Sequence, residues 1–295
     1  MGKWITRILT VVLVGVFVFS GWKLLSIRSV YSKSEKVYSG LANEFTSQQS
    51  SYSDGSESPR TGDSTGDAGA EFVGGVAEPS SAIAPEDRVP IMVDFEKLLE
   101  INQDIIGWIY CEGSVINYPV VHCGNNDYYL EHNIKHESDP CGTIFADRSN
   151  HKGIVDSNII LYGHHMQNMS MFATLKYWRE QAYYDEHPVM WLLTPEGDYR
   201  VELFSCYETS ATGDSYTIFY GPRPEFDAYL DTVAKKSDFI PHDVELDGQA
   251  HYLLLSTCAY SFENARTVLH GKLVPVPSVG GVPIDTALTE ADPAA

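Results

Sequence analysis

The sequence has few basic residues for its length. Its 295 residues include 20 Lys and Arg against 40 Asp and Glu, which gives a formal net charge of -20. Proteins that bind nucleic acids use clustered Lys and Arg to neutralise phosphates, so this composition argues against nucleic acid as a partner. It also argues against a surface that docks broadly on anionic lipid headgroups.

The sequence also lacks the short motifs of several enzyme classes. It contains no P-loop and no G-x-G-x-x-G motif, which argues against nucleotide-dependent chemistry. It has no G-x-S-x-G nucleophile elbow, which argues against a serine hydrolase of that type. No two cysteines have the C-x-x-C spacing of a zinc or redox site. We therefore expect neither a metal nor a cofactor.

Cysteine is scarce, and its count is odd. At least one thiol stays unpaired within the chain, because there are five cysteines: Cys111, Cys123, Cys141, Cys206 and Cys258. A free cysteine is usually a small buried hydrophobe, and we interpret the first four as structural. Cys258 has a different sequence context.

One apolar run lies near the N-terminus. It extends from Ile8 to Trp22, and Lys3 and Arg7 precede it. With its neighbours it approaches the ~20 residues that span a bilayer, and the basic residues before it favour a cytoplasmic N-terminus. We predict a single-pass signal anchor within residues 1–30, a cell-membrane location and an extracytoplasmic catalytic domain. A cleaved signal peptide is the alternative.

The rest of the chain divides into three parts by composition. Within residues 31–90 the sequence turns, from roughly Ser47 to Val89, to Ser, Gly, Asp, Glu and Pro. Such a segment cannot bury enough apolar surface to offset the entropy of ordering, so we predict a disordered spacer. Residues 91–276 form the predicted catalytic domain, and residues 277–295 a disordered tail.

The predicted domain alternates short apolar runs with turn residues. Helical spacing is present at 93–101, 171–178 and 225–236, and strand-like runs lie at 106–110, 116–121, 142–146, 158–162, 189–193, 199–206, 251–255 and 267–274. Seven or eight short strands separated by turns favour a closed or nearly closed barrel. The predicted fold is therefore mostly β, with an N-terminal helix and a few peripheral helices.

An apolar run ends at Cys258, which places its thiol at the mouth of a strand. Arg266 starts the next run after the loop 259–265. If the two strands pair antiparallel, about 4.8 Å apart, the two side chains come within reach. A guanidinium near a thiol favours the thiolate and can donate to a developing oxyanion. A buried cysteine beside a surface arginine is the structural alternative.

Two adjacent histidines, His164 and His165, end another strand-like run. Successive strand residues point to opposite faces, so only one of the pair can face a common site. An imidazole titrates near neutral pH and is suited to acid/base catalysis. His270 is a rival because it shares strand parity with Arg266, and His251 is a weaker one.

These segments together resemble the class B sortases. The resemblance rests on Leu-Ser-Thr-Cys258, on the step of eight residues to Arg266, and on Leu-Tyr-Gly-His164 upstream. Further matching stretches, in the family's order between Val93 and Val274, are Ile106-Gly-Trp-Ile109, Asn117-Tyr-Pro-Val-Val121, Asn126-Asp-Tyr-Tyr-Leu130 and Ser170-Met-Phe172. The ordered set carries more weight than any single motif.

The resemblance implies an eight-stranded barrel and a cysteine transpeptidase. Cys258 would be the nucleophile, His164 the general acid/base, and Arg266 the residue that holds the oxyanion or the substrate. Such enzymes cleave a C-terminal sorting signal of a secreted protein, similar to Leu-Pro-any-Thr-Gly or Asn-Pro-any-Thr, through a thioacyl intermediate. An amine of a cell-wall precursor or a pilin lysine then resolves that intermediate.

The resemblance also implies a groove for the sorting signal. By matching position, Leu130, Tyr162 and Ser256 would line it, and Tyr216 is a further candidate for substrate binding.

Two alternative functions stay open. One is a sortase that polymerises pilins, but the polar C-terminal tail lacks the second membrane segment usual in that class. The other is a surface binding module that keeps the fold without the chemistry. The presence of Cys258, His164 and Arg266 together argues against it.

Overall fold

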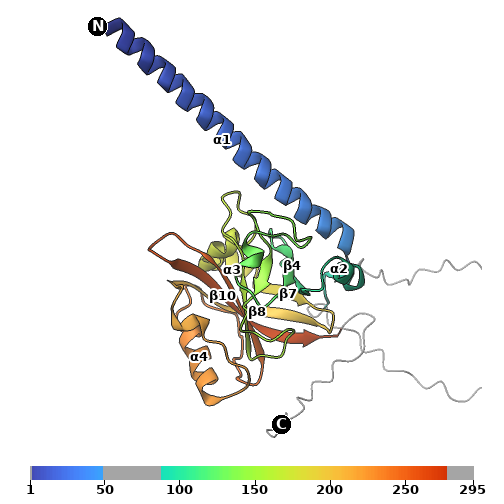
Figure 1. Cartoon of the computed structure of the whole chain (residues 1–295). Helices are drawn as coiled ribbons and strands as arrows, with labels where there is room; N and C mark the ends of the chain where they lie inside the picture. The colour runs from blue at the N-terminus through green and yellow to red at the C-terminus, as the bar shows by residue number, and fades with distance from the viewer. Residues whose placement is uncertain (1, 49–87, 278–295) are drawn as a thin grey trace, which may run out of the picture.

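A closed β-barrel forms the centre of the molecule. The structure, a computed structural model, describes residues 2–48 and 88–277. The strand order around the barrel is β10-β8-β7-β3-β4-β5-β6-β9. Figure 1 shows the long helix α1 leaving one side of the barrel, with the shorter helix α4 packed against the strands elsewhere. The predicted mostly β fold, an eight-stranded barrel with peripheral helices, is confirmed.

The eight predicted runs are the eight barrel strands. They are β3 (Ile105–Tyr110), β4 (Asn117–Val121), β5 (Ile144–Ala146), β6 (Asn158–Tyr162), β7 (Val189–Leu193), β8 (Asp198–Ser210), β9 (His251–Cys258) and β10 (Ala265–Val276). Two neighbouring pairs, β4 with β5 and β6 with β9, are parallel, and the other pairs are antiparallel.

Short helices lie in the segments that connect the strands or precede them. They are α2 (Phe95–Ile101), α3 (Gln181–Glu186), α4 (Pro224–Ala234) and the 3-10 helices η2 (Tyr128–Leu130), η3 (Ala173–Arg179) and η4 (Asp214–Tyr216). The helix predicted at 93–101 begins only after Asp94, because the Asp94 side chain caps it by accepting a hydrogen bond from the Lys97 amide at 3.1 Å. Before this cap, β2 (Ile91–Val93) pairs with β1 (Thr46–Gln48).

The longest helix, α1 (Gly2–Phe45), has 44 residues. Ser34, Tyr38, Leu41 and Phe45 are buried against the barrel. Their spacing of four, three and four residues places them on one face of the helix, as expected for a helix that packs along one stripe.

The second half of α1 differs from the predicted spacer. The predicted spacer began at residue 31, but residues 31–45 continue α1 and contain the regular stripe of residues that the helix buries. Residues 49–87 of the spacer and 278–295 of the tail lie outside the described residues. The remaining domain boundaries stay predictions.

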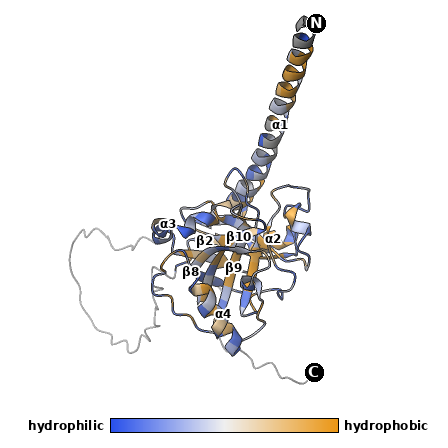
Figure 2. Cartoon of the chain, turned by 90° about the vertical axis from the view of Figure 1, so that its left-hand side faces the viewer, coloured by the Kyte–Doolittle hydropathy of each residue, from blue (hydrophilic) through white to orange (hydrophobic). Residues whose placement is uncertain are grey.

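The predicted membrane anchor is not supported. Within residues 2–48 and 88–277, none of the helices combines the length and apolar content that a membrane crossing needs. The apolar run from Ile8 to Trp22 is about fifteen residues long, which is short of the ~20 that a bilayer requires. Figure 2 shows that apolar colouring is concentrated in the outer half of α1 and gives way to polar residues toward the barrel. The predictions of a single-pass anchor, a cell-membrane location and an extracytoplasmic catalytic domain are therefore not supported by the described residues.

The barrel wall buries apolar side chains on both of its faces. Leu253, Leu255 and Leu269 belong to the main core cluster inside the barrel. Leu254 and Val268 alternate with them and belong to a second cluster, together with residues of α4. Because strand side chains alternate between faces, the even-numbered residues of β9 and β10 face this second, outer cluster.

We expect the inner core to dominate stability. Ile109 on β3 is fully buried, with Leu192 of β7 opposite it. Ile109→Ala removes buried methyl groups and leaves a cavity, which typically costs about 2–5 kcal/mol. The control Val155→Ala alters a side chain that is 57% exposed and should change the free energy of unfolding by less than about 0.5 kcal/mol. Urea unfolding followed by circular dichroism measures both, and equal effects would contradict this account of the core.

Candidate active site

Two parallel strands bring His164 and Cys258 to the same edge of the barrel. In the pairing of β6 with β9, Tyr162 lies opposite Ser256. The Gly163 amide continues the ladder by donating to the Ser256 carbonyl at 3.1 Å. Since parallel strands in register end at a common edge, the residues two positions beyond Tyr162 and Ser256, namely His164 and Cys258, become neighbours.

The third predicted residue, Arg266, lies on the antiparallel strand β10. Arg266 is the register partner of Cys258, and directly opposed side chains have Cβ atoms about 4.5–5.5 Å apart. The Arg266 guanidinium also donates from Nη1 to the Ala265 carbonyl at 2.9 Å. The antiparallel hairpin expected from the sequence is therefore present, with both residues at the end where the loop 259–264 joins the strands.

The His164 imidazole is held by a backbone carbonyl. Its Nε2 lies 2.8 Å from the Leu130 carbonyl oxygen. A carbonyl oxygen only accepts hydrogen bonds, so Nε2 carries the hydrogen and Nδ1 is the nitrogen left to exchange a proton. The His164 carbonyl accepts from the Phe172 amide at 3.0 Å, which fixes the backbone at the start of this loop.

The second histidine of the pair contacts the backbone of Cys258. His165 Nδ1 donates to the Cys258 carbonyl at 2.7 Å, and the His165 ring meets the Tyr260 ring edge-on at 5.2 Å. Both histidines lie beyond the end of β6 at Tyr162, so strand alternation did not reveal this contact. Only adjacency to His164 signalled it, because the contact depends on the shape of the loop beyond β6.

The predicted substrate-binding side chains gather beside the same residues. The Tyr216 hydroxyl lies 2.7 Å from the Ser256 hydroxyl, and its ring stacks on Tyr162 with 6.3 Å between centroids. Burial raises the pKa of Tyr216, the Ser256 hydrogen bond and the Arg266 charge lower it, and Cys258 raises it; the net direction is upward. Tyr216 therefore lies within electrostatic reach of both Arg266 and Cys258. Leu130, the fourth candidate, contributes the carbonyl that holds the imidazole.

A buried carboxylate supports this group of aromatic residues. Asp147, 8% exposed, accepts hydrogen bonds at Oδ2 from the Tyr162 hydroxyl and from Asn126 Nδ2, both at 2.9 Å. Burial, and then the charge of Asp147, raise the pKa of Tyr162 well above its usual range, so the phenol stays a neutral donor. Asp147 was not predicted from the sequence, because a lone aspartate after a short strand carries no recognisable signal.

The rival histidines lie away from this edge. His270 pairs in register with Leu254, four residues or about 13 Å along the strand from Cys258. Its Nε2 lies 3.2 Å from the Tyr207 hydroxyl, and burial lowers its pKa to about 3. His270 is thus a neutral core residue, whereas His251 begins β9 at the opposite end of the strand.

The remaining cysteines are poorly suited to nucleophilic chemistry. All five cysteines, each within the described residues, are free. Burial raises the pKa of the thiols of Cys111 (to about 11), Cys123, Cys141 and Cys206. Because the thiolate is the nucleophile, a raised pKa disfavours reactivity at these four positions.

One pair of histidines has a spacing used in metal sites. His132 and His136 are four residues apart, but Tyr128 lies against both of them. Its ring stacks on His132 at 4.2 Å, and its hydroxyl lies 3.1 Å from His136 Nδ1. Within the described part of the chain, no three His, Cys, Asp or Glu side chains come together as metal ligands.

The known proteins that this chain resembles in sequence and in structure are sortase B enzymes. No family model matches the sequence. The chain is 30% identical to Sortase B of Listeria monocytogenes over 276 residues, which covers 90% of this chain and 95% of that protein. It is 33% identical to Sortase B of Staphylococcus aureus over 184 residues, or 62% of this chain and 75% of that protein. The crystal structure of Clostridium perfringens sortase B has a TM-score of 0.58 and 33% identity, covering 61% of this chain and 100% of that one.

The barrel and these relatives define a sortase-type cysteine transpeptidase. More particularly, the chain belongs to the sortase B family.

The buried neutral His270 predicts a pH-dependent stability. The unfolded chain protonates this side chain near its ordinary pKa of 6.5, whereas the folded protein does so only near 3. The unfolded state therefore binds more protons in this window, so stability is lost as the pH falls through it, by up to about 1.4 kcal/mol per pH unit. The His270→Asn variant lacks this titrating group, so its free energy of unfolding should fall less with pH. The difference in free energy of unfolding between wild type and variant should therefore narrow as the pH is lowered from 7 to 4.5. Urea unfolding of both proteins at each pH checks this, and parallel pH curves would contradict it.

Proposed function

We propose that this sortase B cleaves a C-terminal sorting signal of secreted proteins and joins the product to an amine acceptor of the cell wall. Cys258 acts as nucleophile, His164 as general acid/base and Arg266 as the oxyanion or substrate donor. The observation that supports these roles most directly is the strand register. Arg266 lies opposite Cys258, and His164 follows the strand that runs parallel to Cys258's own.

The first half of the reaction forms a thioacyl enzyme. The Cys258 thiol passes its proton to His164 Nδ1 and attacks the carbonyl carbon of the signal's threonine. Arg266 donates to the oxyanion that develops on that carbonyl. The amide bond then breaks, and His164 returns its proton to the leaving amine.

The second half resolves the thioester. An acceptor amine attacks the thioacyl carbon, and His164 Nδ1 removes its proton. The carbon–sulfur bond breaks, the new amide is released, and the proton returns to the Cys258 sulfur. The Nε2–H bond to the Leu130 carbonyl persists through both halves, which keeps Nδ1 toward the reacting atoms.

The substrate classes are supported by the relatives. Solved sortase B structures with TM-scores of 0.58 and 0.57 to this chain include a Staphylococcus aureus enzyme–substrate complex and a complex with triglycine. We propose a Leu-Pro-any-Thr-Gly-like or Asn-Pro-any-Thr-type signal as donor and a glycine-type or other cell-wall amine as acceptor. Leu130, Tyr162, Ser256 and Tyr216 would contact the signal.

A cleavage assay tests the assignment. The full chain is incubated with fluorogenic peptides of both signal types, with and without triglycine or a lysine side-chain amine. We expect one signal type to be cut and an acceptor to increase product formation. Cys258→Ala and His164→Ala should lower kcat/KM by roughly 10³-fold or more, and Arg266→Lys by about 10²-fold, because an ammonium lacks the planar fork of a guanidinium.

The matched control is His270→Asn, which removes an imidazole that lies away from the site. It should retain activity at pH 7. Mass spectrometry of the wild type should find an acyl adduct on Cys258. Activity that survives His164→Ala but not His270→Asn would overturn the residue assignment, and the absence of both cleavage and adduct would refute the proposed reaction.

A further inference from the structure

We propose that Tyr38 on α1 is a positioning residue for His164. Through Tyr38, the helix supports both the carbonyl that binds the imidazole and the loop that carries it. This inference rests on the acid/base role proposed above for His164, and it assigns part of the active-site geometry to a helix outside the barrel.

The first line of support runs from Tyr38 to the imidazole's partner. The Tyr38 hydroxyl donates to the Gly142 carbonyl. Gly142 has φ +57, and a Cβ there would lie 2.8 Å from the Leu130 carbonyl oxygen, so only a glycine fits against that carbonyl. The same Leu130 oxygen accepts the hydrogen bond from His164 Nε2 at 2.8 Å. A shift of Gly142 would therefore be felt at the atom that orients the imidazole.

A second residue of α1 fixes the same turn. The Ser34 hydroxyl donates to Asp139 Oδ1 at 2.5 Å. The Asp139 carbonyl in turn accepts from the Gly142 amide at 2.9 Å. The turn that abuts Leu130 is thus attached to α1 at two points one helical turn apart.

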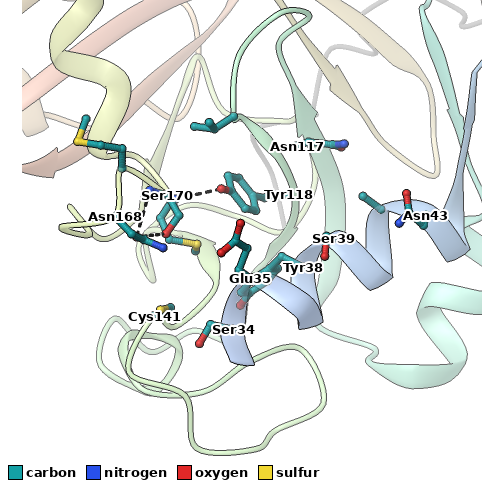
Figure 3. Close-up of a pocket in the computed structure, with 14 residues that line it drawn as sticks. Ser34, Glu35, Tyr38, Ser39, Asn43, Asn117, Tyr118, Cys141, Asn168 and Ser170 are labelled. Atoms are coloured by element: carbon teal, nitrogen blue, oxygen red, sulfur yellow. Dashed lines mark hydrogen bonds between the residues drawn. The ribbon is translucent and has the colours of Figure 1, made fainter. Parts of the chain in front are cut away.

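The second line of support runs from Tyr38 to the histidine loop. The Tyr38 ring meets the Tyr118 ring edge-on, with 5.6 Å between centroids and 84° between planes. The Tyr118 hydroxyl accepts from the Met171 amide at 3.0 Å, as the dashed line in Figure 3 shows. Met171 has φ 57, which is unusual for a residue with a side chain, and it pairs with His165. The Tyr118 bond therefore holds a strained part of the loop that starts at His164.

Packing at this junction makes the Tyr38 hydrogen bond important. A pocket of about 410 Å³ borders Tyr38, Tyr118 and Met171, and Figure 3 shows it between α1 and the loop. Tyr38 itself is 5% exposed. Cys141 of the same turn also lines this pocket, so the buried Tyr38 hydroxyl attaches α1 to the turn at the rim of the pocket.

The test uses Tyr38→Phe in the full chain, which deletes the hydroxyl and keeps the ring against Tyr118. We expect kcat for signal-peptide cleavage to fall about fivefold, since losing one typical hydrogen bond shifts a population by that factor. The KM should not change, because Tyr38 does not touch substrate. The NMR signal of the His164 Nε2 proton should exchange faster with solvent.

The matched control is Tyr252→Phe. Tyr252 is also buried and donates its hydroxyl to a backbone carbonyl, that of Asp247, at 2.9 Å. It lies on β9 six residues before Cys258, about 20 Å along the strand. Its variant should change neither kcat nor the exchange of the His164 Nε2 proton, although its thermal stability falls by a similar amount.

A second variant keeps the proposal testable if Tyr38→Phe unfolds at the assay temperature. Tyr118→Phe removes the bond to the Met171 amide and should also lower kcat and speed exchange. If folded Tyr38→Phe has wild-type kcat and wild-type exchange of the His164 Nε2 proton, the inference is overturned. If Tyr38→Phe does not fold, the same result in Tyr118→Phe overturns it. If the wild type cleaves no peptide, the proposed function fails, while the exchange measurement still decides whether α1 positions the imidazole.

Discussion

The parallel pairing of β6 with β9 is the constraint on which the site depends. A parallel pair ends at one edge of the sheet, so residues far apart in sequence, His164 and Cys258, leave their strands side by side. The antiparallel return of β10 then adds Arg266 opposite Cys258. The strand pairings thereby bring three residues of different chemistry to one edge of the barrel.

Side chains alternate between the two faces of these strands, and this alternation determines the environment of each site residue. The inner face belongs to the main core, where a charge would be strongly disfavoured. The outer face carries Cys258 and Arg266, with the hydrogen-bonded Tyr216–Ser256 pair beside them and Asp147 behind Tyr162. This half-buried polar surface accepts a guanidinium while still excluding part of the solvent. A shift of one residue in register would exchange the two faces, which is why the pairing must be so well specified.

Some features of this fold and site can be predicted from the sequence, and others cannot. The barrel strands and the Cys258–Arg266 hairpin follow from local periodicity and short spacing, so they were predictable. The contacts of His165, Asp147 and Tyr38 join segments many residues apart through loops, and no local pattern encodes a loop's shape. The apolar run near the N-terminus favoured a membrane anchor that the described residues do not support, and the helical stripe of α1 was not recognised in the sequence.

The three central residues differ in how firmly the fold holds them. Cys258 and Arg266 lie on paired strands, where each backbone group has a ladder partner. His164 lies just beyond the end of β6, and its orientation depends on one carbonyl of η2 and on a loop with unusual backbone angles. Local openings are cheapest where few ladder bonds and few apolar contacts must break. The imidazole is therefore the member of the site whose geometry is most sensitive to distant packing, and the surface that α1 covers is where such packing acts on it.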